Sequence, residues 1–139
     1  MIAVCGYRLV AYYISRIVDL PFDAAVAAVT GRLKEHGFGL LSDIDVQATL
    51  KAKIGAEVGA YRILGACNPR FAHQALQIED KLGVLLPCNV IVRETADGRV
   101  EIASIDPVGS MERTGNDALG PLALEVRRLL ASAIEQTGS

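Results

Sequence analysis

A chain of 139 residues, 51% of them hydrophobic, has the size of one ordinary domain and enough apolar side chains to bury a core. Its formal net charge of −2 and its lack of tryptophan argue against a nucleic-acid partner, which normally meets a clustered basic surface or a row of aromatic rings. The sequence contains no uncharged apolar stretch of about 18 residues or more, so no membrane partner is expected.

The cysteines indicate a reducing compartment. Three are present, Cys5, Cys67 and Cys88, and an odd number fits poorly with the paired disulfides of a secreted domain. Residues 1–20 lack the charged start and the small-residue cleavage site of a signal peptide. We therefore expect a cytoplasmic protein with one domain over residues 1–139, of which residues 1–6 lie outside regular structure.

The first predicted elements are a strand and a helix. Residues 7–18 are rich in Tyr, Val and Ile, which is typical of a strand. A helix follows from Pro21, and Gly37 ends it, because glycine readily adopts the left-handed conformation that closes a helix. Its core face carries Phe22, Val26, Val29 and Leu33.

A second strand and a short helix come next. Residues 38–44 form a short apolar run that predicts a strand. Asp45 is placed to cap a helix that ends at Gly55. One face of this helix carries Val46, Leu50 and Ile54.

The third strand is predicted over residues 61–67 and leads directly into a helix. Asn68 is a good N-cap, and Pro69 occupies the first helical position, where its missing N–H costs nothing. Gly83 closes this helix. Its buried stripe is predicted to contain Phe71, Ala75, Ile78 and Leu82.

A hairpin and a final helix complete the chain. Residues 90–95 and 99–105 flank Asp97-Gly98, a dipeptide favoured in turns between antiparallel strands. Residues 107–116 predict a loop, and residues 117–136 predict a helix. The core side of that helix is predicted to carry Leu122, Val126, Leu129 and Ala133.

Four to five strands with about four helices and a hairpin predict an α+β fold with a mostly antiparallel sheet. Such a sheet often has helices on one face only, which leaves the other face for water, a ligand or a second subunit. Residues 9–14 do not alternate between apolar and polar, which indicates that both faces of the first strand are covered. A homodimer would cover the second face.

The candidate site is a dipeptide that occurs twice, as Cys67-Asn68 and Cys88-Asn89. Each copy stands beside a proline at the edge of an apolar run, where a strand meets a loop. Functional residues concentrate at such places. Cys67 also precedes the start of a helix, whose backbone N–H groups favour a thiolate or a bound anion. The alternative is a small buried residue that ends a strand.

The topology decides whether the two thiols can act together. In parallel neighbouring strands, Cys67 would lie at one end and Cys88 at the other, about 20 Å away. In antiparallel neighbours the ends coincide, and Cα atoms come within about 5 Å, the range of a disulfide or a shared metal. The strand–helix–strand order favours the parallel arrangement.

A metal site would need a further ligand. His73 is the histidine closest in sequence to Cys67 and Cys88, and two thiols with one imidazole could bind zinc. However, His73 lies about 200° around the helix from Phe71, on its polar side, so no metal is expected. Residues 37–39 (Gly-Phe-Gly) lack the spacing of a dinucleotide-binding loop, and the sequence identifies no cofactor.

A series of short motifs runs from Leu20 to the last predicted helix. They are Leu20-Pro21-Phe22, Gly37-Phe38-Gly39, Ile44-Asp45-Val46-Gln47-Ala48-Thr49-Leu50-Lys51, Tyr61-Arg62-Ile63-Leu64-Gly65-Ala66-Cys67-Asn68-Pro69, His73 with Ala75-Leu76, Leu86-Pro87-Cys88-Asn89-Val90, and Ile105-Asp106-Pro107. In this order they resemble the family known as domain of unknown function 302, over roughly residues 20–136. The resemblance implies a compact α+β domain that occurs as a homodimer, and it implies no particular activity.

Three functions follow from these observations. The first is a homodimeric module that binds a small, perhaps anionic, molecule near Cys67, Asn68, Cys88 and Asn89. The second is a thiol-dependent enzyme or redox protein with Cys67 as the nucleophile and Cys88 as its resolving partner. The third is a structural dimer without chemistry. Neither thiol has a general base beside it in the sequence, which favours binding over catalysis.

Overall fold

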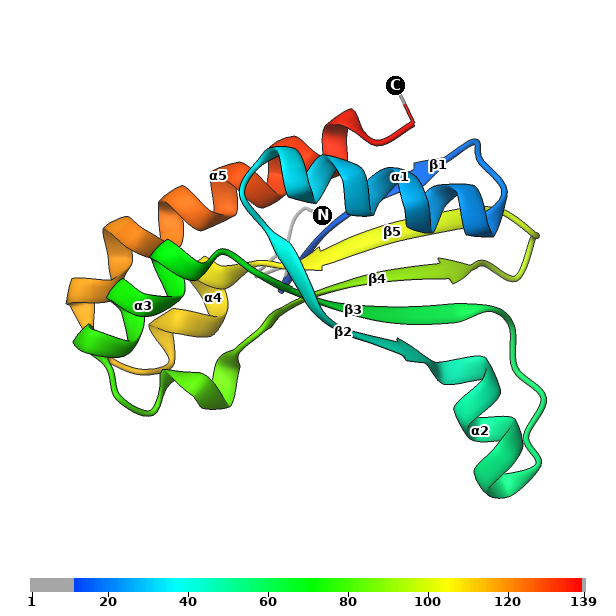
Figure 1. Cartoon of the computed structure of the whole chain (residues 1–139), viewed down its shortest axis with the longest axis horizontal. Coiled ribbons are helices and arrows are strands. Elements are labelled where there is room, and N and C mark those ends of the chain that lie inside the picture. The colour runs from blue at the N-terminus through cyan, green and yellow to red at the C-terminus, as the bar shows by residue number, and fades with distance from the viewer. Residues whose placement is uncertain (1–11, 139) are drawn as a thin grey trace.

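The computed structural model describes residues 12–138, in which five antiparallel strands form one sheet (Figure 1). The strand order is β1-β5-β4-β3-β2, so β1 and β2 are the edges. The strands are β1 (Tyr13–Val18), β2 (Gly39–Asp45), β3 (Tyr61–Cys67), β4 (Cys88–Glu94) and β5 (Val100–Ile105). The sheet and its helices confirm the α+β class, while Cys5 and the predicted start of the first strand lie outside the described residues.

The helices are distributed unevenly around the sheet. In Figure 1, α1 (Phe22–Glu35) and α5 (Gly120–Gln136) lie across one face. The shorter α3 (Pro69–Ile78) and α4 (Pro107–Glu112) gather at one end of the sheet. By contrast, α2 (Val46–Ile54) projects away from the opposite end. None of the helices within residues 12–138 is long and apolar enough to cross a membrane.

The main core lies between the sheet and the α1–α5 layer. Because side chains alternate along a strand, one face of the sheet supplies Leu64, Val90 and Ile102, all completely buried. Leu33 from α1 and Leu130 from α5 pack against them. A second, smaller cluster joins α3, α4 and α5 at the end of the sheet and contains Ala75, Leu82, Met111, Leu119 and Ala123.

The face of the sheet turned away from α1 and α5 is called the open face here. Its middle row, read across the strands, pairs Ser15 with Ala103, Ala103 with Ile91, and Ile91 with Ile63. The next row pairs Ile17 with Glu101, Glu101 with Arg93, and Arg93 with Tyr61. The open face therefore carries both apolar and polar side chains, and the register places them in straight rows.

The predicted parallel arrangement of the third and fourth strands is wrong. β3 and β4 pair antiparallel, with Ala66 opposite Cys88. The chain between them folds into α3 and a 3-10 turn (Leu82–Leu85) that lie beyond the end of the sheet, so it returns without crossing the sheet. The twenty residues between the two cysteines are therefore used as a cap on the sheet and not as a crossover.

The predicted helix after Asn68 ends earlier than expected. α3 stops at Ile78, because Glu79 has an extended backbone with φ −139° and ψ 107°. Leu82 is buried as predicted, but it lies in the separate 3-10 turn. Ile78 is more than a third exposed and does not belong to the core.

The loop predicted at residues 107–116 begins instead with α4. The Asp106 side chain accepts a hydrogen bond from the backbone N–H of Val108 at 3.0 Å, and Pro107 occupies the first helical turn. These are the capping signals of a helix start. The final helix is close to its prediction, with a 3-10 turn (Asp117–Leu119) before α5.

The predicted cap of α2 is confirmed, whereas its apolar face is not part of the core. Asp45 accepts a hydrogen bond from the backbone N–H of Ala48 at 2.9 Å, and Gly55 closes the helix with φ +68°. No side chain of α2 is buried, and Ile54 is 74% exposed. This helix projects from the end of the sheet and buries none of its residues.

Candidate functional site

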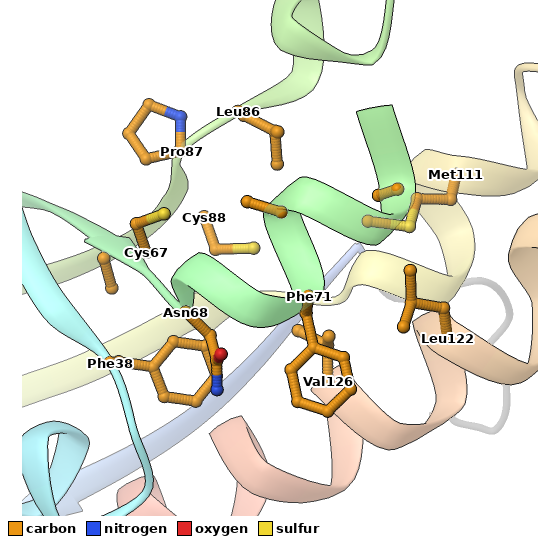
Figure 2. A pocket seen from close by; sticks show the side chains of 13 residues that line it. Phe38, Cys67, Asn68, Phe71, Leu86, Pro87, Cys88, Met111, Leu122 and Val126 are labelled. Atoms are coloured by element: carbon orange, nitrogen blue, oxygen red, sulfur yellow. The ribbon is translucent and has the colours of Figure 1, made fainter. Parts of the chain in front are cut away.

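The two Cys-Asn motifs meet at one end of the sheet. β3 ends with Cys67 and β4 begins with Cys88, and because the strands are antiparallel these ends are neighbours. Figure 2 shows both cysteines beside the start of α3. The structure thus brings together the two motifs that are separated by twenty residues in the sequence.

The two thiols nevertheless leave the sheet on opposite sides. Ala66 is the residue opposite Cys88, so Cys67, one position further, must face the other way. In Figure 2, Cys67 lies beside Pro87, whereas the Cys88 side chain points toward α3. Both thiols are free within residues 12–138. A disulfide needs Cβ atoms that face each other, so this register does not favour one.

A small pocket lies where the end of the sheet meets α3, α4 and α5 (Figure 2). The volume of this pocket is about 30 Å³. The residues that line it are Phe38, Ala66, Cys67, Asn68, Phe71, Ala72, Ala75, Leu86, Pro87, Cys88, Met111, Leu122 and Val126. None of these thirteen side chains is charged, and the pocket is mostly apolar.

Cys88 is the more deeply placed of the two thiols. Its residue is 7% exposed and belongs to the main core, while Cys67 is half-buried. Burial, with a smaller contribution from the nearby Cys67, raises the pKa of the Cys88 thiol from 9.0 to about 11. The Cys88 thiol is therefore protonated and neutral near pH 7.

Asn68 holds the N-cap position of α3 but does not cap with its side chain. Its backbone is extended, and its carbonyl oxygen accepts the N–H of Ala72 at 2.9 Å, yet no side-chain cap bond forms. Its Nδ2 atom lies 2.9 Å from the position that a Cβ atom on Gly37 would occupy. The expected capping role is thus only partly correct, and the amide of Asn68 lines the pocket instead.

Asn89 does not join the other three candidate residues. Asn89 follows Cys88 on β4 and pairs with Gly65 on β3. Its side chain is exposed on the open face. The predicted set of Cys67, Asn68, Cys88 and Asn89 therefore divides into three residues at the pocket and one on the far side of the sheet.

His73 lies on the exposed face of α3, as helix phase predicts. Its Nε2 atom is 3.5 Å from Nε2 of Gln77. In the described part of the chain, no three His, Cys, Asp or Glu side chains gather closely enough to hold a metal ion. The set of Cys67, Cys88 and His73 considered for zinc is therefore not assembled in this structure.

Sequence reasoning placed Leu122 and Val126 on the core side of the last helix but did not connect them with the site, and it missed Met111. Met111 on α4 and Leu122 and Val126 on α5 form its far wall. Asp106-Pro107 repeats the signal of Asn68-Pro69, a capping residue followed by proline, and could have revealed α4 and with it Met111. The long-range contact between α3 and α5 has no comparable local signal.

Comparison with known proteins identifies the family and supports the fold. Residues 14–137 match the family described as domain of unknown function DUF302. One solved structure that resembles the chain is described as an uncharacterized conserved protein DUF302 from Bacillus stearothermophilus. The two sequences are 23% identical, the match covers 92% of this chain and 99% of that one, and the TM-score is 0.87. No curated protein matches the chain.

Proposed function

The chain belongs to the DUF302 family, whose description names no activity, and we propose that it acts as a homodimeric binding module for a small uncharged ligand. The ligand site is the pocket beside Cys67, Asn68 and Cys88. The observation that carries this proposal is the position of the pocket, which adjoins both motifs and opens between three helices and the end of the sheet.

The size of the pocket limits what can enter. A space of about 30 Å³ exceeds the roughly 10–15 Å³ that one water molecule needs. It is far smaller than the cavity of about 150 Å³ that holds benzene in a well-studied case. A ligand would therefore insert a small apolar group, such as the end of an alkyl chain, while the rest of it stays outside.

The lining favours an uncharged ligand over the anionic one that the sequence suggests. The start of α3 would attract an anion, but the neighbouring side chains are apolar and carry no positive charge. The buried Cys88 thiol remains protonated at neutral pH. An anion would lose its hydration here without gaining a partner, which is costly.

The same features argue against the alternative of a thiol-dependent enzyme. A resolving cysteine must reach the sulfur of its partner, but the register turns the side chains of Cys67 and Cys88 in opposite directions, although both border the pocket. Attack also requires a thiolate, whereas burial disfavours that form of Cys88. Nothing else in the pocket lining could act as a general base, since its remaining polar side chain is the amide of Asn68.

Xenon is a suitable probe for the pocket because it is small, apolar and uncharged. In NMR spectra, dissolved xenon is expected to shift the methyl signals of Met111 and Leu122, which line the pocket. Ala72→Leu should abolish these shifts by filling the space from α3. The same substitution on the exposed side of α1, Ala27→Leu, is the matched control and should preserve them. Unshifted methyl signals in the wild-type protein would contradict the proposal.

For the homodimer we propose the surface formed by β2 and α2. Leu41, Ile44 and Ile54 on these elements are 70%, 47% and 74% exposed. β2 is an edge strand, and an edge strand can pair with a strand of another chain. α2 has only nine residues and buries none of them, so packing within its own chain stabilises it little. A second copy would bury these side chains.

Light scattering tests this dimer surface. The wild-type protein is expected to have twice the mass of the chain, and Ile54→Lys is expected to give the mass of one chain. Val84→Lys places the same charge at another apolar residue, which is 85% exposed and lies in the 3-10 turn after α3, and should remain dimeric. A monomeric wild-type protein would refute the dimer, while a dimer that does not bind xenon would support the purely structural alternative.

The cytoplasmic location and the single domain expected from the sequence remain predictions.

A further inference from the structure

A larger hollow lies on the open face, separated from the pocket by the sheet. Its volume is about 480 Å³, within the range of roughly 300–1,000 Å³ that is typical of small-molecule sites. It crosses the strands β1, β5, β4 and β3. The residues that line it are Tyr12, Tyr13, Tyr61, Asn89, Ile91, Arg93, Glu101, Ala103, Ser104 and Ile105.

The hollow exists because a small residue occupies the centre of the open face. Ala103 and Ile91 stand opposite each other in the middle row and form an apolar floor. The row beside them contains the longer Tyr61 and Arg93. Tyr13, on the edge strand β1, borders the opposite side of the hollow. Larger side chains therefore surround a short one, and Ala103, only 7% exposed, lies at the bottom of the hollow.

Polar groups stand at the two ends of this floor. Asn89 is exposed at one end, and its side chain makes no hydrogen bond to any of residues 12–138. Arg93 lies four residues from Asn89 along β4, a distance of about 13 Å. Its Nε atom donates to Glu101 at 2.7 Å, so the pair offers donors and acceptors together with no net charge. Both ends can therefore bind a group that donates and accepts hydrogen bonds.

Tyrosine rings border the floor on two sides. Tyr12 and Tyr13 have ring centroids 5.0 Å apart at an angle of 77°, and they are 75% and 45% exposed. Tyr61 lies across the hollow on β3. Aromatic side chains of this kind stack on planar rings and bring a hydroxyl group to their edge.

We propose that this hollow binds an uncharged, planar heteroaromatic compound with amide-like groups along one edge. The ring system lies over Ala103 and Ile91 between the tyrosines, and its amide-like edge meets Asn89. A strongly anionic ligand is disfavoured, since Glu101 neutralises Arg93. This site is distinct from the pocket near the cysteines, and it does not depend on the function proposed for that pocket.

Riboflavin is the probe, because its flat ring system is uncharged and carries amide-like groups along one edge. Titration of the protein with riboflavin, followed by fluorescence anisotropy, is expected to give saturable binding. Ala103→Leu fills the floor and should weaken binding by about tenfold or more. Asn89→Ala removes one hydrogen-bonding group and should weaken it by about two- to tenfold. Ala27→Leu on α1 is the matched control and should bind like the wild-type protein.

Thermal unfolding of each variant shows whether the fold is intact, and Asn89→Ala, at an exposed position, provides a second test if Ala103→Leu does not fold. Ribitol, the side chain of riboflavin without its ring, should not displace it. The proposal is overturned if riboflavin shows no saturable binding up to its solubility limit, or if both variants bind it as tightly as the control. Such a result would leave xenon binding at the other pocket unaffected, so the two failures are distinguishable.

Discussion

At the scale of single residues, the environment of Cys88 determines its chemistry. The residue follows Pro87 and starts a strand whose alternate side chains enter the core, so its thiol is surrounded by apolar groups. Burial there raises the pKa of the thiol to about 11. The unfolded chain has no such burial, so its Cys88 loses its proton near the ordinary value of 9.0.

This difference predicts a dependence of stability on pH. Between pH 9 and 11 the unfolded state binds fewer protons at Cys88 than the folded state, so the free energy of unfolding falls as the pH rises. Two pKa units correspond to about 2 to 3 kcal/mol. Urea unfolding of the wild-type protein and Cys88→Ala at several pH values measures this: the fall should be smaller in the variant.

Cys67→Ala is the control for that comparison, because it leaves Cys88 and most of its burial in place. It should therefore show nearly the same fall as the wild-type protein. An equal fall in Cys88→Ala and the wild-type protein would mean that the thiol is not buried in solution.

At the scale of elements, α4 illustrates how a short segment completes the site. Asp106 accepts hydrogen bonds from the N–H of Val108 and from Nε of Arg127, each at 3.0 Å. It thereby joins β5, α4 and α5 at one point. Met111 on α4 belongs both to the pocket lining and to the second core cluster, so the cap of this helix supports the far wall of the pocket.

Asp106→Ala is expected to lower the free energy of unfolding by about 1 to 2 kcal/mol, mostly through loss of the cap. The pair with Arg127 adds little, because that arginine is about half exposed. Asp106→Asn keeps a capping oxygen and should lose less. Asp80→Ala, at an aspartate whose side chain is 84% exposed and pairs only with the equally exposed Lys81, should change stability by less than about 0.5 kcal/mol. Urea unfolding of the three variants provides the measurement, and equal stabilities would contradict the cap.

Local signals explain which elements could be predicted from the sequence. Asp45, Gly37, and Asp97-Gly98 each determine a helix end or a turn through their own backbone or side chain, and the structure contains these features where they are expected. The partner of a strand depends instead on contacts far away in the chain. The antiparallel pairing of β3 and β4 was therefore not recoverable from spacing alone.

The same distinction applies to the candidate site. Cys67, Asn68 and Cys88, which the sequence proposes because the repeated motif marks strand ends, lie together at the pocket. Asn89, proposed with them, lies on the other face, since adjacent residues in a strand face opposite ways. The hollow above Ala103 could not be foreseen, because it arises from residues on four strands that only the register brings together.

At the scale of the whole molecule, the helices of residues 12–138 lie over one face of the sheet and not over the other (Figure 1). The covered side holds the small pocket at its end, and the open face holds the larger hollow. α2 stands apart from both, at the opposite end from α3 and α4. The pocket therefore lies apart from the hollow, whereas the proposed dimer surface reaches the open face through Ile44, which stands in the same row as Ile91 and Ala103.

Because buried and less buried side chains alternate along β4, the length of this strand cannot change without consequence. Deleting or inserting a single residue within this strand would exchange its two sides from that point on, so a polar amide would enter the oily interior while an aliphatic side chain emerged into water. Length variation among related chains should accordingly be confined to the connecting segments, and the central strands should keep a constant number of residues.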